Sequence, residues 1–83
     1  MDGPAVQSGL LTLQRYAGWL DRDRTSVAVR ADVRALGAAI DTGANASAFL
    51  QTLDVDIARL PSGGIRKMLR ATAGQIRRAL GES

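Results

Sequence analysis

The 83-residue chain contains no cysteine and no histidine. Without cysteine it can form neither a disulfide nor a thiolate metal site, which fits a reducing compartment. Without histidine it lacks the side chain that most often performs acid–base chemistry near neutral pH. The glycine patterns that bind nucleotide phosphates are also missing. We therefore predict a protein that is not an enzyme and has no metal site and no cofactor.

Aromatic residues and long apolar runs are scarce as well. Tyr16, Trp19 and Phe49 are the only aromatic residues, so closely packed helices rich in alanine are favoured over a large aromatic core. No apolar run approaches the roughly 18 residues that would span a bilayer. The first four residues lack the basic and apolar regions of a signal peptide. We expect a cytoplasmic location and no membrane contact.

Positive and negative charges are separated along the chain. The net charge is +3, but residues 59–83 carry six cations against one acid. Residues 35–58 have three aspartates and no cation. A basic end beside an acidic middle can pair within the fold or face two different partners.

Apolar residues recur at spacings of three and four along most of the chain, a pattern typical of helices. Turn residues divide the chain into four helical segments, at about 4–21, 26–41, 45–60 and 63–80. Thr25, Ser26 and Ser62 are candidate N-caps. The apolar seams are Val6, Leu10, Leu13, Ala17 and Leu20; Val29, Val33, Leu36 and Ile40; and Ala46, Leu50, Leu53, Ile57 and Leu60. We predict a single all-α domain over residues 1–83, with four short helices in a compact bundle or an orthogonal array.

Residues 27–33 admit a second interpretation. Val27, Val29, Ala31 and Val33 alternate with period two, as in a strand. No other segment is available to pair with them, and an isolated strand is unstable. Helix is therefore the prediction here.

The fourth segment carries the clearest functional signal. At about 100° per residue, its apolar residues gather on one side and its cations occupy the opposite arc, about 120° wide. No Asp or Glu interrupts this arc, which contains Arg66, Lys67, Arg70, Arg77 and Arg78. Exposed helix faces usually mix both signs, so a face of one sign predicts an acidic partner, either a protein or a nucleic acid. A solvated face without a partner is the alternative.

Tyr16 and Trp19 are a second candidate contact. Trp19 lies off the apolar seam of the first segment, and Tyr16 lies between the seam and Trp19. A lone tryptophan is more often core than interface, so burial of Trp19 is the favoured interpretation. If Trp19 is exposed, the aromatic pair beside Arg15 and Arg22 has the composition of a protein-binding hot spot.

Asp54 and Asp56 come closest to a paired-carboxylate site. Two positions apart on a helix, they lie about 200° apart and cannot converge on one substrate or ion. The further oxygen ligands of a calcium loop do not follow them. We therefore predict no catalytic residue.

Residues 35–54 partly resemble a helix-turn-helix. Ala39, Gly43 and Phe49 stand where that motif has its small residue, its turn glycine and a buried apolar residue. The segment that would read DNA, residues 45–54, has no Arg or Lys, although phosphate contacts normally supply much of the affinity. A chance match is the preferred interpretation.

In size, helical content and Ala- and Arg-rich composition, the whole chain resembles small helical antiactivators, such as the QseM-like proteins of integrative and conjugative elements. The resemblance carries no diagnostic motif and assigns no site residue. It implies a bacterial regulator from a mobile genetic element that binds a transcriptional activator and blocks it. We expect a protein partner with an acidic surface. Nucleic-acid binding through residues 63–80 is the alternative, and a structural subunit of a larger assembly is a distant third.

Overall fold

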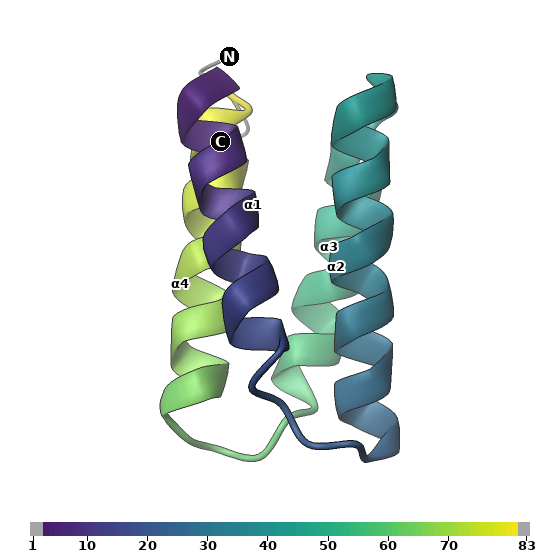
Figure 1. The fold of residues 1–83 in the computed structure, drawn as a ribbon, viewed down its shortest axis with the longest axis vertical. Coiled ribbons are helices and arrows are strands. Elements are labelled where there is room, and N and C mark those ends of the chain that lie inside the picture. The colour runs from purple at the N-terminus through teal and green to yellow at the C-terminus, as the bar shows by residue number, and fades with distance from the viewer. Residues whose placement is uncertain (1–2, 82–83) are drawn as a thin grey trace.

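The computed structural model describes residues 3–81, which form four helices joined by short loops (Figure 1). The helices are α1 (Gly3–Ala17), α2 (Arg24–Thr42), α3 (Ala46–Ala58) and α4 (Gly64–Ala79). There is no strand between residues 3 and 81. The all-α prediction is confirmed, and the period-two alternation of residues 27–33 lies within α2.

The helices run alternately down and up, so that every neighbouring pair is antiparallel (Figure 1). Each helix packs on two others, and the closest pairs are α1 with α4 and α2 with α3. The long axis measures 33 Å and the two short axes 20 Å. The structure is therefore a bundle and not an orthogonal array. The α1–α2 and α3–α4 loops meet at one end, whereas α1 begins and α4 ends at the other (Figure 1).

The geometry of the α2–α3 hairpin differs from that of a helix-turn-helix. In that motif the two helices cross at roughly 90–120°, whereas α2 and α3 lie antiparallel (Figure 1). Phe49, which would be buried in the motif, is 37% exposed. The chance-match interpretation agrees with this geometry.

The core is built from the predicted apolar seams. Fully buried side chains come from all four helices and include Val6, Leu13, Val29, Leu36, Leu50, Leu53, Ile57, Leu69 and Ile76. Leu20, Ile40 and Leu80, near the ends of the helices, are partly buried against this core. Each seam faces inward because residues three and four apart share one side of a helix.

Glycine sets how closely α1 approaches α4. A Cβ atom on Gly9 would lie 2.7 Å from Cγ1 of Ile76, closer than two carbons can pack. A Cβ atom on Gly37 would lie 3.5 Å from Cδ2 of Leu10, which is an ordinary contact. Gly9 is therefore needed for the α1–α4 contact, whereas the α1–α2 contact tolerates a methyl group at position 37.

The first helix ends four residues earlier than predicted. The Gly18 N–H donates to the Gln14 carbonyl at 3.0 Å, and then Trp19 and Leu20 donate to carbonyls three residues back. Glycine is a poor helix former, and the chain leaves the helix after Ala17. Trp19 and Leu20 consequently lie in the loop.

At two helices the residue at the N-cap differs from the predicted one. Asp23 occupies the N-cap of α2, and Ser26 is buried inside its first turn. Gly63 occupies the N-cap of α4, while Ser62 accepts a hydrogen bond from Arg66 instead. At α3 the side chain of Asn45 accepts a hydrogen bond from the Ser47 N–H at 3.0 Å, as an N-cap should.

Candidate partner-binding surface

The five cations of α4 fall into two groups, one of four residues and one that consists of Arg77 alone. Lys67, Arg70 and Arg78 are exposed, and their side chains have no ion pair or hydrogen bond with any other residue between 3 and 81. Arg66 is half-buried, and its guanidinium donates to the Ser62 hydroxyl at 3.2 Å. These four residues, called the basic strip below, face the outside of the bundle.

Arg77 differs from the basic strip because its guanidinium is paired with a carboxylate. Its Nη2 atom is 2.5 Å from Oδ2 of Asp54 on α3, and both side chains are about a third exposed. The pair joins α4 to α3, and so links the basic C-terminal segment to the acidic middle segment of the sequence. Because Asp54 engages the guanidinium, Arg77 contributes to the bundle and is not included in the candidate surface.

Three hollows follow one another along the side of the bundle that carries the basic strip. The first, about 270 Å³, lies at the loop end and includes Trp19, Gly63 and Arg66 in its lining. The second, about 220 Å³, shares Gly63 and Arg66 with the first. The third, about 430 Å³, shares Lys67 and Arg70 with the second and reaches Arg78. The shared residues make the three hollows one continuous surface.

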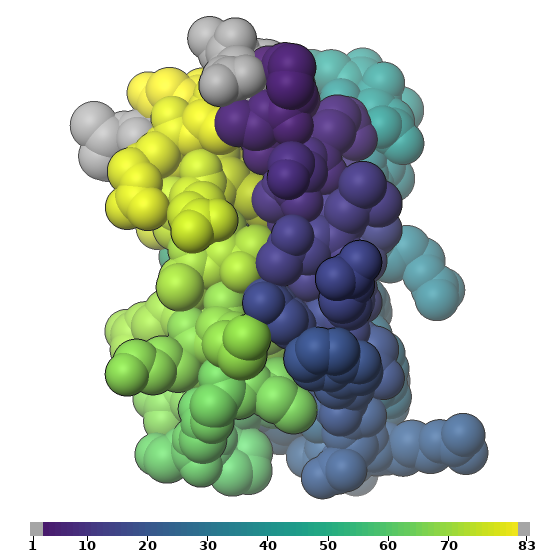
Figure 2. All heavy atoms as spheres, turned by 60° about the vertical axis from the view of Figure 1, so that its left-hand side comes forward, coloured from purple at the N-terminus to yellow at the C-terminus, as the bar shows by residue number. Residues whose placement is uncertain are grey.

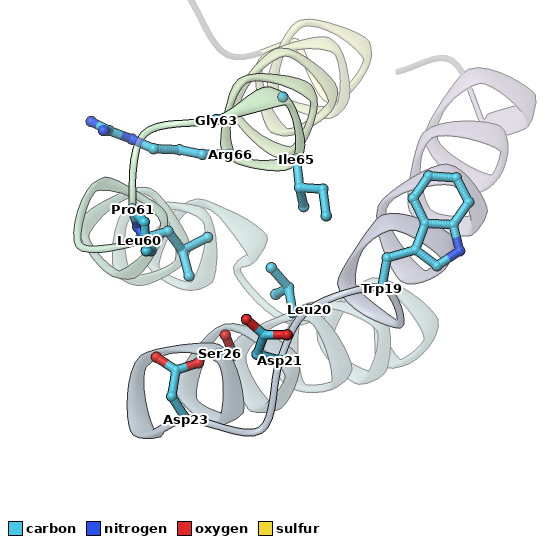
Figure 3. Close-up of a pocket in the computed structure, with 11 residues that line it drawn as sticks. Trp19, Leu20, Asp21, Asp23, Ser26, Leu60, Pro61, Gly63, Ile65 and Arg66 are labelled. Atoms are coloured by element: carbon cyan, nitrogen blue, oxygen red, sulfur yellow. The ribbon is translucent and has the colours of Figure 1, made fainter.

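The first hollow, called the end pocket below, has an apolar floor (Figure 3). Leu20 from the α1–α2 loop, Leu60 from the α3–α4 loop and Ile65 from α4 point toward its centre. Asp21 and Asp23 stand on the α2 side, and Arg66 stands on the α4 side (Figure 3). The pocket thus has a neutral floor with carboxylates on its α2 side, whereas the Arg66 side chain extends from α4 over the α3–α4 loop, away from the centre (Figure 3).

Trp19 is on the surface, and the interpretation that placed it in the core is wrong. Its side chain is 58% exposed, because α1 ends before it and the loop carries it outward. Its ring centroid is 5.3 Å from that of Tyr16, with the ring planes tilted by 56°. Tyr16 is half-buried against the core. One ring is therefore held by the bundle and supports the other.

Met68 extends this aromatic pair across α4. It is 41% exposed, although the sequence pattern placed it on the apolar side of the helix. Met68 lies nine residues before Arg77, which is half a turn around the helix at about 100° per residue. Since Arg77 faces α3, Met68 faces the opposite side, toward α1. We call Tyr16, Trp19 and Met68 the apolar patch.

The contact between Gly9 and Ile76 places Met68 at the same height as the aromatic pair. Because α1 and α4 are antiparallel, Tyr16, which follows Gly9 on α1, lies level with Leu69, which precedes Ile76 on α4 by the same number of residues. Figure 2 shows α1, in purple and blue, beside α4, in green and yellow, over the full height of one face. Met68 therefore adjoins the aromatic pair, whereas Arg66 and Arg70, which at about 100° per residue lie within about 20° of Arg77, stand on the α3 side of α4.

A carboxyl pair at the α2–α3 contact was not predicted. Burial, with the neighbouring Asp56, raises the pKa of Asp32 to about 7, and one Asp32 oxygen is buried without a hydrogen-bond partner. The other member, Asp56, is 3.8 Å from Arg59. Sequence reasoning compared Asp56 with Asp54 on the same helix and missed its neighbour on α2. Among residues 3–81, no three or more potential ligands cluster closely enough to hold a metal ion.

Comparison with known proteins gives no match to a family model, to a curated protein or to a solved structure. None of the described helices has the length and apolar character needed to cross a membrane. The function must therefore be inferred from the surface of the bundle.

Proposed function

We propose that this protein is a non-enzymatic regulator that binds an acidic surface of a partner protein through the basic strip and the apolar patch. The observation that supports the proposal is that Lys67, Arg70 and Arg78 are exposed and form no ion pair with any other residue between 3 and 81, so that α4 presents an exposed face of one sign. Exposed cations steer an acidic partner and fix its orientation. Aromatic and methionine side chains supply the desolvated contacts from which affinity arises.

The alternative of a merely solvated face fits the basic strip less well. Arg66 and Arg70 stand four residues apart on α4, and Lys67 and Arg70 stand three apart. Like charges at these spacings destabilise a helix by about 0.2–0.5 kcal/mol per pair. Attraction to an acidic partner offsets this repulsion, so binding such a partner accounts for a face that carries one sign of charge.

The proposed partner is a transcriptional activator in the cytoplasm, and binding blocks its action. Support for this part comes from the resemblance to small helical antiactivators in size, helical content and composition. A bundle 33 Å long acts on a larger protein most simply by covering a surface that the larger protein needs. No chemical step is required for such a role.

Nucleic-acid binding is the second candidate, and a specific observation favours it. The third hollow runs along α4 between Lys67, Arg70 and Arg78, and exposed Trp19 offers a ring on which a base can stack. The rim formed by Asp21 and Asp23 opposes it, because these carboxylates repel phosphate beside the same surface. We rank this function second.

A pair of charge reversals tests the proposal. The variant Lys67→Glu/Arg70→Glu changes the basic strip, and Arg24→Glu/Arg34→Glu makes the same change of net charge on exposed residues of α2. The purified chain and both variants are used to capture partners from the native host, with and without nuclease. The captured protein is then identified, and its affinity for each variant is measured by calorimetry.

We expect the strip variant to lose at least tenfold in affinity for the captured activator, while the α2 variant binds like the parent chain. Helicity measured by circular dichroism should be the same in all three. Salt titrations with a DNA duplex and a single-stranded RNA cover the second candidate. Submicromolar nucleic-acid binding at physiological salt, unchanged by Tyr16→Ala or Trp19→Ala, would reverse the ranking of the two functions.

A further inference from the structure

We infer that the end pocket is a socket for one large apolar side chain of the partner, carried by an acidic segment that continues along the basic strip. The inference rests on the proposed function, and it adds the chemistry and the direction of the segment that is bound. The occupant is one acidic, amphipathic stretch of a partner protein.

The size and lining of the end pocket suit a side chain. Pockets for drug-sized ligands usually measure about 300–1,000 Å³, and this one measures about 270 Å³. Leu20 and Ile65 are only partly buried by the rest of the protein, so they keep apolar surface that an incoming side chain can cover. Covering apolar surface contributes about 25 cal/mol per Å².

The walls of the end pocket are held in place before anything binds. The Arg30 guanidinium of α2 donates to the carbonyl of Leu20 at 3.1 Å and to that of Asp21 at 2.8 Å, which fastens the α1–α2 loop. On the other side, Pro61 has a fixed φ and restricts the α3–α4 loop. A preformed socket costs less conformational entropy on binding than one that must close around its ligand.

The carboxylates on the α2 side of the pocket and the cations along α4 give the segment a direction. Asp21 and Asp23 repel acidic residues on the α2 side, and the Ser26 hydroxyl beside Asp23 lowers the pKa of that carboxyl and keeps it ionised. Arg66 begins the attractive side, which continues along α4 to Arg78. Arg78 follows Arg66 by twelve positions on the helix, a distance of about 18 Å. The apolar residue therefore stands at one end of the bound segment, and its carboxylates follow over about three helical turns.

A random peptide library is the probe for this inference. Twelve-residue peptides displayed on phage are selected against the full chain, and the enriched sequences are then synthesised. Their affinity for the chain is measured by calorimetry, because the ring of Trp19, the only tryptophan, extends away from the centre of the end pocket (Figure 3). We expect the enriched peptides to carry one large apolar residue at an end, followed by three or more Asp or Glu.

Two variants fill the socket. Gly63 and Gly64 line the end pocket, and a Cβ atom on either one meets nothing within 4 Å. Gly63→Leu and Gly64→Leu, made separately, place a large apolar side chain at the wall of the pocket. Gly3→Leu is the matched control, because Gly3 has the same open surroundings at the other end of the bundle. We expect at least one filling variant to bind the peptides tenfold more weakly, while the control binds unchanged.

The possible results separate this inference from the proposed function. If Lys67→Glu/Arg70→Glu abolishes peptide binding but both filling variants bind like the parent, the proposal of a socket is wrong, whereas the proposal of an acidic partner is supported. The socket is equally wrong if the enriched peptides need no apolar residue. If no acidic peptides are enriched, or if the α2 charge reversal is as harmful as the strip reversal, both ideas are wrong.

Discussion

The two closely packed helix pairs of the bundle use their polar residues in opposite ways. In the α2–α3 pair, Asp32 faces Asp56, which in turn contacts Arg59. In the α1–α4 pair, the cations of α4 make no hydrogen bond or ion pair with another described side chain beyond the Arg66–Ser62 hydrogen bond and the Arg77–Asp54 pair. The carboxylates Asp32 and Asp56 are thus engaged within the α2–α3 pair, whereas the basic strip presents its cations outward. This difference locates the candidate surface without any knowledge of the partner.

The largest expected effects come from the core, where the two halves should behave alike. Leu53 in the α2–α3 pair and Ile76 in the α1–α4 pair are both fully buried. Each change to alanine should lower the free energy of unfolding by about 2–5 kcal/mol, because it removes buried apolar atoms and leaves a cavity. Urea denaturation followed by circular dichroism measures both. If Leu53→Ala unfolds like the parent chain, the assignment of the α3 core is wrong.

The next largest effect on stability should distinguish the α1–α4 contact from the α1–α2 contact. Gly9→Ala places a methyl group against Ile76, and overpacking of this kind costs about 1–3 kcal/mol, partly offset by the higher helix propensity of alanine. Gly37→Ala meets only ordinary contacts and should stabilise the protein by up to about 1 kcal/mol. Thermal unfolding of the two variants gives the comparison.

A double variant sharpens the test of the α1–α4 contact. Ile76→Ala removes the atom that the new methyl group would meet, so Gly9→Ala should no longer destabilise the protein in that background. The coupling energy from the four-member cycle should therefore be clearly different from zero. Additive effects would show that α1 and α4 are not in close contact at Gly9.

The third prediction concerns pH and the carboxylates of the α2–α3 pair. Because the folded-state pKa of Asp32 is raised from 3.8 to about 7, its contribution to stability is complete below about pH 4 and is lost as the pH rises to about 7. Asp32→Asn removes this loss and should stabilise the protein at pH 8 by about 1 kcal/mol, a value discounted for solvent screening. At pH 4 the substitution should have little effect.

Unfolding at the two pH values, with Asp41→Asn as an exposed control on the same helix, checks this prediction. The control should change stability by a similar small amount at both pH values. A stabilisation by Asp32→Asn that is no larger at pH 8 than at pH 4 would mean that the pKa of Asp32 is not raised in the folded protein.

The smallest expected effects compare single cations of α4. Arg77→Gln breaks the pair with Asp54 and should cost about 0.5 kcal/mol, since half-exposed pairs are worth little. Arg70→Gln removes a cation that pairs with no other described residue and relieves repulsion within α4, so stability should stay constant or rise slightly. In binding experiments the order should reverse, with Arg70→Gln the more harmful change.

The fold was largely predictable because each helix has its own seam at spacings of three and four. Leu13, Leu36 and Leu53 are buried as those seams indicate. The choice between bundle and array depends on how helices cross, and the Gly9–Ile76 contact that helps fix this joins residues far apart in the chain. Seam spacing carries no information about such a contact.

The candidate surface was only partly predictable. The one-sign face of α4 was visible because it lies within one helix, but the pairing of Arg77 depends on Asp54 of another helix. Exposure of Trp19 was missed because the apolar seam continued to Leu20, past the point where Gly18 ends the helix. The Asp32–Asp56 pair needed the α2–α3 register, which no local pattern reveals.

The composition of the end pocket links binding to folding. One wall comes from the loop between α1 and α2 and the other from the loop between α3 and α4, so the pocket exists only while the helix pairs remain docked. Any occupant binds the folded chain alone and must therefore stabilise it, by about 2.7 kcal/mol at a concentration one hundred times its Kd. For a domain of this size, such a gain raises the melting temperature by roughly 10–20 °C. A thermal-shift screen can therefore find occupants of the end pocket before the natural partner has been isolated.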